Sequence, residues 1–313
     1  MLRSTFQLLA VSFLFLPLFS GCFWFENSHF EGAVWSDDGE AVAFVSHSYM
    51  ARKTFGHTQK KDYYTRVNVS DTFEGDYAGT QLGSAMPGRM TSLYYMKSEG
   101  YVLVGRESKK TEVSNGQNPN EERTITFDKM ELDGTQTQVA RVTGLTMVSC
   151  DGGQSAFSGL PPVVVFPSPD GKRFAVLKGE SSCESVSQTI SFLDAHTLEH
   201  EGETIEVDLN ALVPTGVAQP AMLVNLLPMA WLDDESFMIG FGAFQSDMTK
   251  GWVYTVNGET SWREDMKFDC LYPATSSSYV NAQGQSIEIG HGGWFDIGPA
   301  SSDADGQTFG CSE

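Results

Sequence analysis

The chain repeats one local pattern: an apolar run, a tight polar turn and a second run in which apolar and polar residues alternate. The clearest copy is Val163–Lys178, VVVFPSPDGKRFAVLK. Alternation with period two is typical of a strand with one buried face, and the Pro-Asp-Gly turn favours a hairpin. Related stretches turn near Gly39, Gly100, Asp234 and Gly284. A hairpin that recurs along the chain constrains the fold strongly, because such repeats stack into one architecture.

Further strands follow each hairpin. A third strand, rich in aromatic and β-branched residues, is predicted at Tyr63–Ser70, Arg123–Leu132, Gln188–Leu193, Gly251–Val256 and Gly293–Ile297. A fourth, more polar strand is predicted at Gln136–Val142, Thr204–Val207 and Ser261–Met266. Four strands per unit, repeated about every 50 to 70 residues, are the signature of a β-propeller blade. We therefore expect an all-β propeller of about five four-stranded blades, or six or seven if the inserts hide degenerate ones; a pair of β-sandwiches and a β-helix are the alternatives.

A large aromatic residue stands just before the turn in three of the copies: Trp35, Phe166 and Trp231. A single four-stranded meander has two faces and covers neither of them, whereas stacking meanders around an axis buries both. We therefore expect these three rings to fill the space between neighbouring blades.

The pattern W-S-x-D-G, followed by alternating apolar residues, resembles the TolB-like and WD-like propeller repeats of bacterial envelope proteins. The resemblance is clearest at Val34–Phe44 and Phe166–Val176, and weaker at Trp231–Ile239. The chain departs from TolB itself in that no α/β domain precedes the repeats and a lipobox replaces a simple signal peptide. The partner of TolB, the peptidoglycan-associated lipoprotein, is therefore not carried over.

The N-terminal segment has the features of a secretory signal peptide. Arg3 is its one charged residue, and an apolar run follows from Phe6 to Phe19. This run is too short for a comfortable membrane span.

The segment Leu18–Cys22, LFSGC, resembles the lipobox of bacterial lipoproteins, which implies that Cys22 carries the acyl chains of the mature protein. Such chains anchor a protein because each buried methylene contributes about 0.8 kcal/mol. Phe23 follows the cysteine, and the lack of Asp there implies the outer membrane of a two-membrane bacterium; the alternative is a plain signal peptide with a coincidental cysteine. We expect a signal peptide at 1–21, a lipidated tether at 22–29 and the propeller at 30–313.

The other cysteines are Cys150, Cys183, Cys270 and Cys311. An even number in an exported chain suggests two disulfides, for which three connectivities exist. We favour Cys150 with Cys183 and Cys270 with Cys311, the pairs nearest in sequence. Neither a CxxC motif nor Cys/His spacing typical of zinc sites is present.

Charge narrows the range of partners. Acidic residues outnumber basic ones 40 to 20, so the net charge is -20. A field of this sign repels phosphate backbones, which excludes nucleic acid as an expected partner and favours cations or cationic partners. The simpler alternative is that the acidity only keeps an exported protein soluble.

One stretch has the opposite charge: Met50–Lys61, MARKTFGHTQKK, which carries four Lys or Arg residues and a histidine. It lies between the second and third predicted strands, where we expect an exposed loop. The candidate contacts to an acidic glycan, lipid or protein partner are Arg52, Lys53, His57, Lys60 and Lys61. The alternative is an ordinary solvated loop.

Candidate catalytic and metal-binding residues are few. The G-x-S-x-G motif of serine hydrolases is absent. His196 and His200 have no HExxH around them and are expected as exposed turn residues, while His291 lies in a glycine-rich segment. Asp303 and Asp305 resemble the opening of a calcium loop, although the glutamate at its twelfth position is lacking, and an Asp-Gly turn is the alternative.

These observations favour a lipid-anchored protein of the bacterial cell envelope that acts as a non-enzymatic scaffold for a protein, peptide or glycan. We expect no cofactor, and structural calcium is the alternative. The rival interpretation is a cation-dependent envelope enzyme, such as a glycan lyase or lactonase, with its site at the propeller axis. A third is a purely structural lipoprotein. Fold alone does not decide among them.

Overall fold

The computed structural model describes residues 24–54, 57–71, 79–111, 121–145, 147–149, 155–157, 163–181, 186–207, 229–241, 249–266, 285–289 and 295–299. All regular elements in these residues are β-strands. Cys22, the other four cysteines, His291, Asp303 and Asp305 lie outside the described residues.

Four sheets contain four strands each. The first sheet consists of β1 (Trp24–Trp35), β2 (Val42–Thr54), β3 (His57–Ser70) and β4 (Thr80–Pro87). The second consists of β5 (Arg89–Met96), β6 (Tyr101–Thr111), β7 (Glu121–Glu131) and β8 (Gln136–Leu145). The third consists of β11 (Val163–Pro167), β12 (Arg173–Ser181), β13 (Val186–Asp194) and β14 (His200–Val207). The fourth consists of β15 (Met229–Trp231), β16 (Ser236–Phe241), β17 (Thr249–Thr255) and β18 (Thr260–Met266).

Two shorter sheets complete the described fold. One pairs β9 (Met147–Ser149) with β10 (Ser155–Phe157). The other pairs β19 (Gln285–Ile289) with β20 (Phe295–Pro299), and β20 overlaps the third strand expected at Gly293–Ile297.

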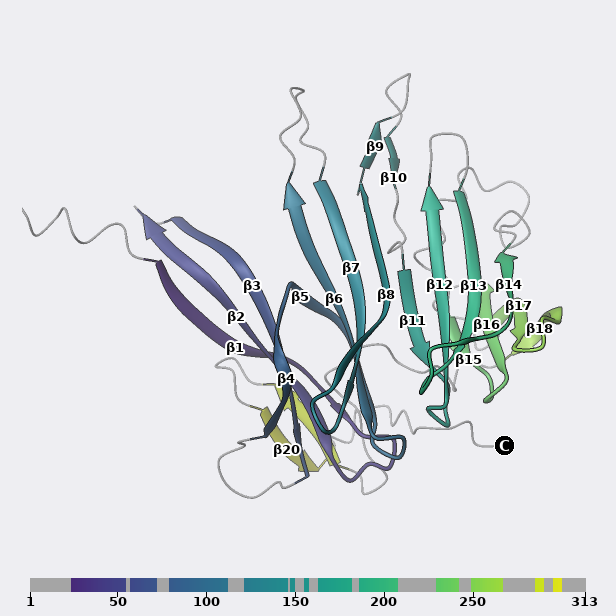
Figure 1. The fold of residues 1–313 in the computed structure, drawn as a ribbon, viewed down its shortest axis with the longest axis horizontal. Helices are drawn as coiled ribbons and strands as arrows, with labels where there is room; N and C mark the ends of the chain where they lie inside the picture. The colour runs from purple at the N-terminus through teal and green to yellow at the C-terminus, as the bar shows by residue number, and fades with distance from the viewer. Residues whose placement is uncertain are drawn as a thin grey trace, which may run out of the picture.

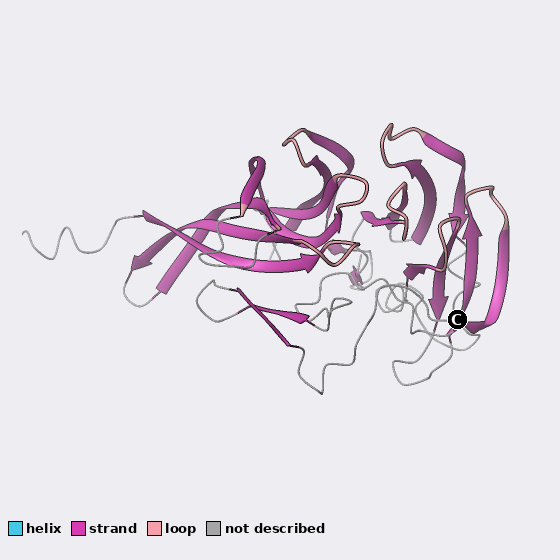
Figure 2. Ribbon diagram, turned by 90° about the horizontal axis from the view of Figure 1, so that it is seen from below, coloured by secondary structure: helices cyan, strands magenta, loops and turns pink. Residues whose placement is uncertain are grey.

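Each four-stranded sheet is an antiparallel meander whose strands are neighbours in chain order. This confirms the all-β class and the four-stranded antiparallel units, which are consistent with propeller blades. The opening stretch forms β11 and β12, with Val163 opposite Lys178 and Phe166 opposite Ala175. Figure 1 shows the sheets following one another across the molecule, and Figure 2 shows them from below.

The hydrophobic core lies between sheets rather than within one. One buried cluster joins residues of the first and second sheets, among them Trp35 and Val102. A second cluster joins the second, third and fourth sheets, among them Tyr101, Phe192 and Phe237. Each sheet therefore completes the core of its neighbour, as expected for stacked meanders.

The three aromatic residues before the turns lie where the sequence predicts them. Trp35, Phe166 and Trp231 are all buried. The ring of Phe166 packs 6.4 Å from that of Tyr94 in the second sheet and 5.5 Å from that of Phe237 in the fourth. The Nε1 of Trp231 donates a hydrogen bond of 3.1 Å to the carbonyl of Phe166, so these rings bridge neighbouring sheets.

The first sheet differs from expectation at its N-terminus. β1 begins at Trp24, and the register places Trp24 opposite Arg52 and Ser28 opposite Ser48. Residues 24–29, expected in the tether, are therefore paired with β2. The physical reason is that β2 continues beyond its predicted end to Thr54 and offers its backbone groups to this segment.

Candidate functional site

The turns that join the first two and the last two strands of each sheet lie at the same end of the sheets, because each sheet is an antiparallel meander. We call this end the hairpin end. Its described turns occupy residues 36–41, 97–100, 132–135, 168–172, 195–199, 232–235 and 256–259. It is the candidate functional site because turns at one end of stacked sheets commonly form a binding surface.

Two of these turns have the same internal bonding. In the third sheet the Ser168 hydroxyl donates to the Asp170 carboxylate over 2.6 Å and accepts from the Arg173 amide over 3.0 Å. In the first sheet Ser36 bonds to Asp38 over 2.5 Å and to the Ala41 amide over 2.9 Å. The sequence similarity of the two copies therefore extends to their hydrogen bonds.

Gly171 is required in the third-sheet turn for two reasons. Its φ of 72° is one that residues with a side chain rarely adopt, and a Cβ at this position would lie 2.9 Å from Cγ of Glu99. The second reason applies because the turn lies close to Glu99 of the second sheet. The Asp-Gly turn thus closes the hairpin that the sequence predicts and also allows two sheets to meet.

Asp37 and Asp38 join the first and second sheets. Asp37 accepts hydrogen bonds from the amide of Lys97 over 2.8 Å and from the amide and hydroxyl of Ser98. Asp38 forms an ion pair with Lys97 over 2.8 Å. Burial raises the pKa of Asp38, but hydrogen bonds from Lys97, Ser36 and the Glu40 amide outweigh it, so its pKa lies below the usual value.

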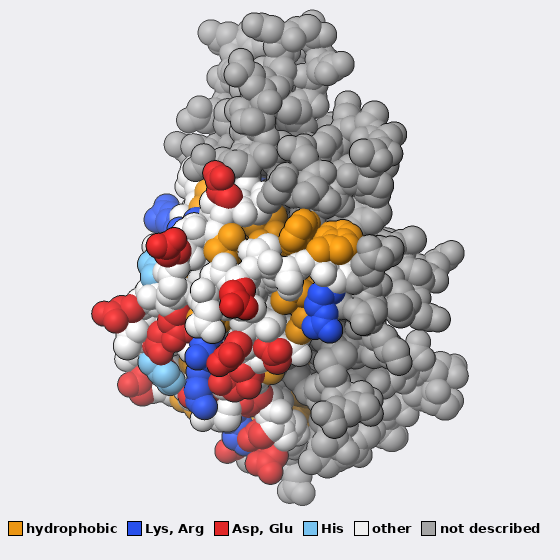
Figure 3. Space-filling view, turned by 90° about the vertical axis from the view of Figure 1, so that its right-hand side faces the viewer, with side chains coloured by type: hydrophobic (Ala, Val, Ile, Leu, Met, Phe, Trp, Pro, Cys, Tyr) orange, Lys and Arg blue, Asp and Glu red, His pale blue; other side chains and the backbone are white. Residues whose placement is uncertain are grey.

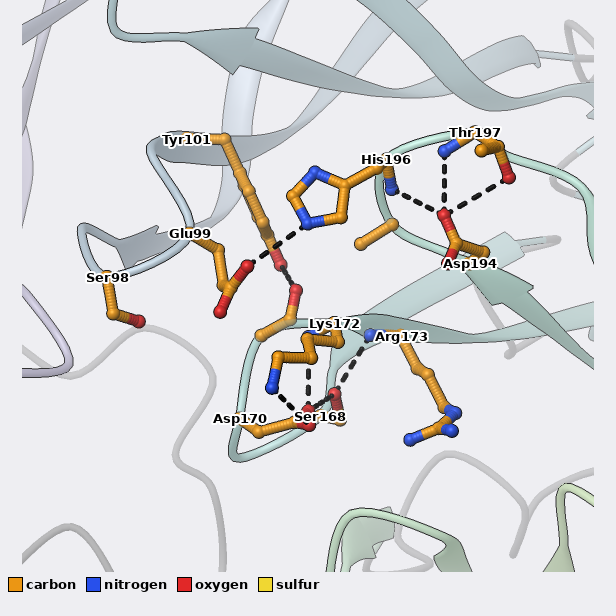
Figure 4. Close-up of polar contacts among 12 residues, drawn as sticks. Ser98, Glu99, Tyr101, Ser168, Asp170, Lys172, Arg173, Asp194, His196 and Thr197 are labelled. Carbon is orange, nitrogen blue, oxygen red and sulfur yellow. Dashed lines mark hydrogen bonds and ion pairs between the residues drawn. The ribbon is translucent and has the colours of Figure 1, made fainter.

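Polar contacts at the hairpin end also join the second and third sheets, and Figure 4 shows them in part. The Tyr101 hydroxyl donates to the carbonyl of Gly171 over 2.7 Å. The Nε2 of His196 lies 3.1 Å from the Glu99 carboxylate. Lys129, which is 2% exposed, donates from Nζ to the carbonyl of Ala195 over 2.7 Å.

Sequence reasoning missed Lys129. Its Nζ also lies 2.7 Å from the Glu131 carboxylate and 5.6 Å from the centre of the Tyr101 ring. A buried lysine of this kind is stabilised by the carbonyl and the carboxylate that it contacts. The carbonyl belongs to residue 195, far away in the chain, so no local pattern around Lys129 could have indicated the contact.

The third and fourth sheets are joined in the same manner. Asp234 accepts a hydrogen bond of 2.9 Å from the amide of Asp170. The guanidinium of Arg173 donates to the carbonyl of Asp234 over 3.3 Å and to the carboxylate of Glu201 over 2.6 Å. Side chains or backbone groups thus connect all four four-stranded sheets, in chain order, at the hairpin end.

Asp194 holds the turn between β13 and β14. Its carboxylate accepts from the amides of Thr197 and His196 over 2.7 Å and 2.9 Å, and from the Thr197 hydroxyl over 3.1 Å (Figure 4). The Thr197 amide is the main cause that lowers the pKa of Asp194 below its usual value. The side chain acts as an acceptor for its own turn, in the manner of an Asx turn.

This geometry indicates structural rather than catalytic carboxylates. Asp37, Asp38, Asp170 and Asp194 each accept hydrogen bonds that hold a turn or join two turns. In the part of the chain that the structure describes, no group of three His, Cys, Asp or Glu residues could hold a metal ion. The recurrence of Asp at these turns is explained by turn chemistry.

No protein-family model matches the chain. No curated protein matches it either. Among solved structures, acylaminoacyl peptidase of Pyrococcus horikoshii is similar over 83% of this chain, with 8% identity and a TM-score of 0.37, and this chain spans 35% of the length of that protein. Kluyveromyces lactis Hsv2 is similar over 77% of this chain and 98% of its own, with 9% identity and a TM-score of 0.22. At these values neither likeness supports an argument about activity or partner.

The predicted basic loop is part of a strand pair. Arg52 and Lys53 belong to β2, and His57, Lys60 and Lys61 belong to β3, with Arg52 opposite Gln59 and Thr54 opposite His57. The expectation of a loop over this whole stretch is therefore wrong. Its polar composition obscures the strand signal, whereas the β1–β2–β3 pairing satisfies the backbone groups.

The two histidines lie on one hairpin but at different places. His196 is in the turn and contacts Glu99, while His200 opens β14 opposite Leu193. Both histidines are exposed, as expected, but His200 is a strand residue and not the turn residue that the sequence predicts.

The side face that carries β14 and β18 is rich in carboxylates, as Figure 3 shows. Its exposed acidic residues on and beside β14, β16 and β18 are Glu199, Glu203, Glu206, Asp233, Asp234, Glu235 and Glu259.

In the described residues, no helix is long and apolar enough to cross a membrane.

Proposed function

We propose that the protein is a lipid-anchored β-propeller of the bacterial cell envelope that acts as a non-enzymatic scaffold for a protein, peptide or glycan. The scaffold surface is the hairpin end. The proposal combines the TolB-like repeats, the lipobox at Cys22 and the arrangement of the four sheets. A ring of about five blades is supported by the contact between β19 and β1, which brings the last described sheet next to the first.

One observation carries the choice of a scaffold over an enzyme: the turns of successive sheets are tied to one another. Asp37, Lys129 and Asp234 each reach from their own sheet to a turn of the neighbouring one. A surface whose loops are fixed in this way loses little conformational entropy when it binds a partner. The carboxylates of Asp37 and Asp234 on this surface already accept hydrogen bonds from other groups of the protein.

The lipid anchor is tested by following cleavage of the signal peptide and attachment of the protein to the membrane. Globomycin should block maturation, and Cys22→Ala should release the protein from the lipoprotein fraction of the outer membrane. A wild-type protein recovered entirely in the soluble fraction would contradict the anchor.

Non-reducing mass mapping should find Cys150 linked to Cys183 and Cys270 to Cys311.

The scaffold is tested by photo-crosslinking in intact envelopes. A photoreactive amino acid at Leu132 or Lys172, both exposed at the hairpin end, should yield one reproducible product. The matched control carries the same amino acid at Thr204, which is exposed on the edge strand β14. Equal labelling from all three positions, or none from the hairpin end, would contradict the assignment of the surface.

A calcium titration separates the scaffold from the rival enzyme. A scaffold should show no large rise in melting temperature on addition of calcium. A large rise would indicate a bound cation that stabilises the native state by mass action, and would favour the enzyme.

A further inference from the structure

The β2–β3 hairpin extends beyond the rest of its sheet. β4 pairs with β3 only from Tyr64 to Val69, whereas β2 and β3 remain paired as far as Thr54 and His57. β1 accompanies them, with Trp24 opposite Arg52. The result is a three-stranded extension, which projects away from the other sheets in Figure 1.

The base of the extension is held by aromatic rings. The rings of His47 and Tyr63 are stacked, with centroids 5.1 Å apart and an interplanar angle of 15°. The ring of Tyr49 lies 5.8 Å from that of Tyr63. His47 and Tyr49 are buried, so these contacts stabilise the extension where it leaves the four-stranded sheet.

The far part of the extension is basic, in a chain whose net charge is -20. Its cations are Arg52, Lys53, Lys60 and Lys61, and Met50–Lys61 contains no acidic residue. The register places Lys60 opposite Ala51 and Lys61 opposite Met50. At a rise of about 3.3 Å per residue, all four therefore lie within about 15 Å of the last pair, Thr54 and His57.

The cations are divided between the two faces of the extension. Residues directly opposite in an antiparallel pair share a face, and successive residues alternate. Arg52 and Lys61 therefore belong to one face, and Lys53 and Lys60 to the other. The register therefore distributes the basic positions near the tip over both faces of the extension.

The chain enters the extension at this same tip. Cys22 precedes Trp24 by two residues, a length that spans at most about 7 Å, and Trp24 is paired with Arg52. An acyl chain on Cys22 would therefore enter the membrane beside the basic tip. This placement, together with the charge, selects a lipid surface over a soluble acidic partner.

We propose that the tip of the β2–β3 hairpin binds the anionic phospholipid headgroups of the membrane in which Cys22 is anchored. The inference rests on the proposed lipid anchor and adds a second contact to it. Each Lys or Arg near an anionic surface strengthens binding about five-fold, so four together contribute on the order of 10²- to 10³-fold. The tip contact orients the protein on the membrane, which the acyl chains alone do not.

The test uses the full acylated protein reconstituted on vesicles of pure phosphatidylcholine or of phosphatidylcholine with phosphatidylglycerol. Hydrogen–deuterium exchange of the peptide that spans residues 50–62 is followed by mass spectrometry. We expect this exchange to be at least about five-fold slower on the anionic vesicles. Salt at about 0.5 M should remove the difference, because it screens the attraction.

Two variants with equal charge changes complete the test. R52Q/K53Q/K60Q/K61Q should lose the difference between the two kinds of vesicle. R89Q/R141Q/K172Q/R263Q, whose sites are exposed on the other sheets or beside them, should keep it. Equal exchange of the wild-type peptide on both kinds of vesicle would overturn the inference, as would loss of the difference in both variants.

Flotation of the same samples separates this inference from the proposed anchor. Acylated protein should float with both kinds of vesicle whether or not the tip binds. Failure to float with phosphatidylcholine alone would contradict the anchor, and flotation with anionic vesicles only would then still support the basic tip. Failure to float with either kind would contradict both.

Discussion

At the scale of single residues, short polar side chains next to glycine determine how the turns close. Ser36 and Ser168 are fully buried and bond within their turns in the same way. Where Glu235 replaces the glycine in the fourth sheet, Asp233 accepts from the Glu235 amide over 2.9 Å and the turn still forms. In the fourth sheet a carboxylate acceptor therefore holds the turn without a glycine at this position.

Asp194→Ala tests this dependence directly. The change removes the acceptor for two amides and a hydroxyl, so we expect a loss of about 1–2 kcal/mol in the free energy of unfolding. Asp194→Asn retains an acceptor oxygen and should lose less. Urea denaturation of the two variants checks the order, and equal stability of both to the wild type would show that the bonds contribute nothing.

The lowered pKa values predict how stability depends on pH. Asp38 and Asp194 have a lower pKa in the folded protein than the ordinary value of 3.8, so near pH 4 and below the unfolded chain binds more protons than the native one. Their contribution is present above that value and is lost as pH falls through the folded pKa. Melting temperatures between pH 7 and pH 2.5 should fall less steeply for Asp38→Asn/Asp194→Asn than for the wild type; a steeper fall in the variant would contradict the assignment.

At the scale of elements, sheets are held together by groups that reach across from one to the next. Trp231 combines a buried ring with a hydrogen bond to Phe166. Trp231→Phe should therefore cost about 1–3 kcal/mol, and Trp231→Ala about 3–5 kcal/mol. Trp262→Phe is the matched control, because Trp262 is 39% exposed and should change stability by less than about 0.5 kcal/mol. Thermal and urea unfolding measure both; equal losses at the two sites would contradict an inter-sheet role.

At the scale of the whole molecule, the excess of negative charge opposes folding. A net charge of -20 repels itself more strongly in the compact state than in the expanded one. Raising sodium chloride from about 10 mM to about 300 mM shortens the screening length several-fold. The melting temperature should therefore rise with salt, and a fall would show that ion pairs such as Lys97 with Asp38 outweigh the net repulsion.

The sequence predicts the strands well because their signals are local. Periodicity and turn residues place β11 and β12 almost to the residue, and Trp35, Phe166 and Trp231 mark the inter-sheet positions. Contacts between distant residues are not visible in this way, and Lys129 with Ala195 is one of them. The extension formed by β1, β2 and β3 was missed for a related reason: its polar stretch is a strand only because three segments pair with one another.

The incomplete pairing of β3 has a consequence for self-association. β4 reaches only as far as Tyr64, which leaves the segment 57–62 at the edge of the extension. An open edge of this kind can recruit the same edge of a second molecule and start a growing stack of strands. Lys60 and Lys61 belong to that segment, so two copies that approach edge to edge bring like charges together. The residues proposed to hold the protein on its membrane would then also keep crowded copies from aggregating there.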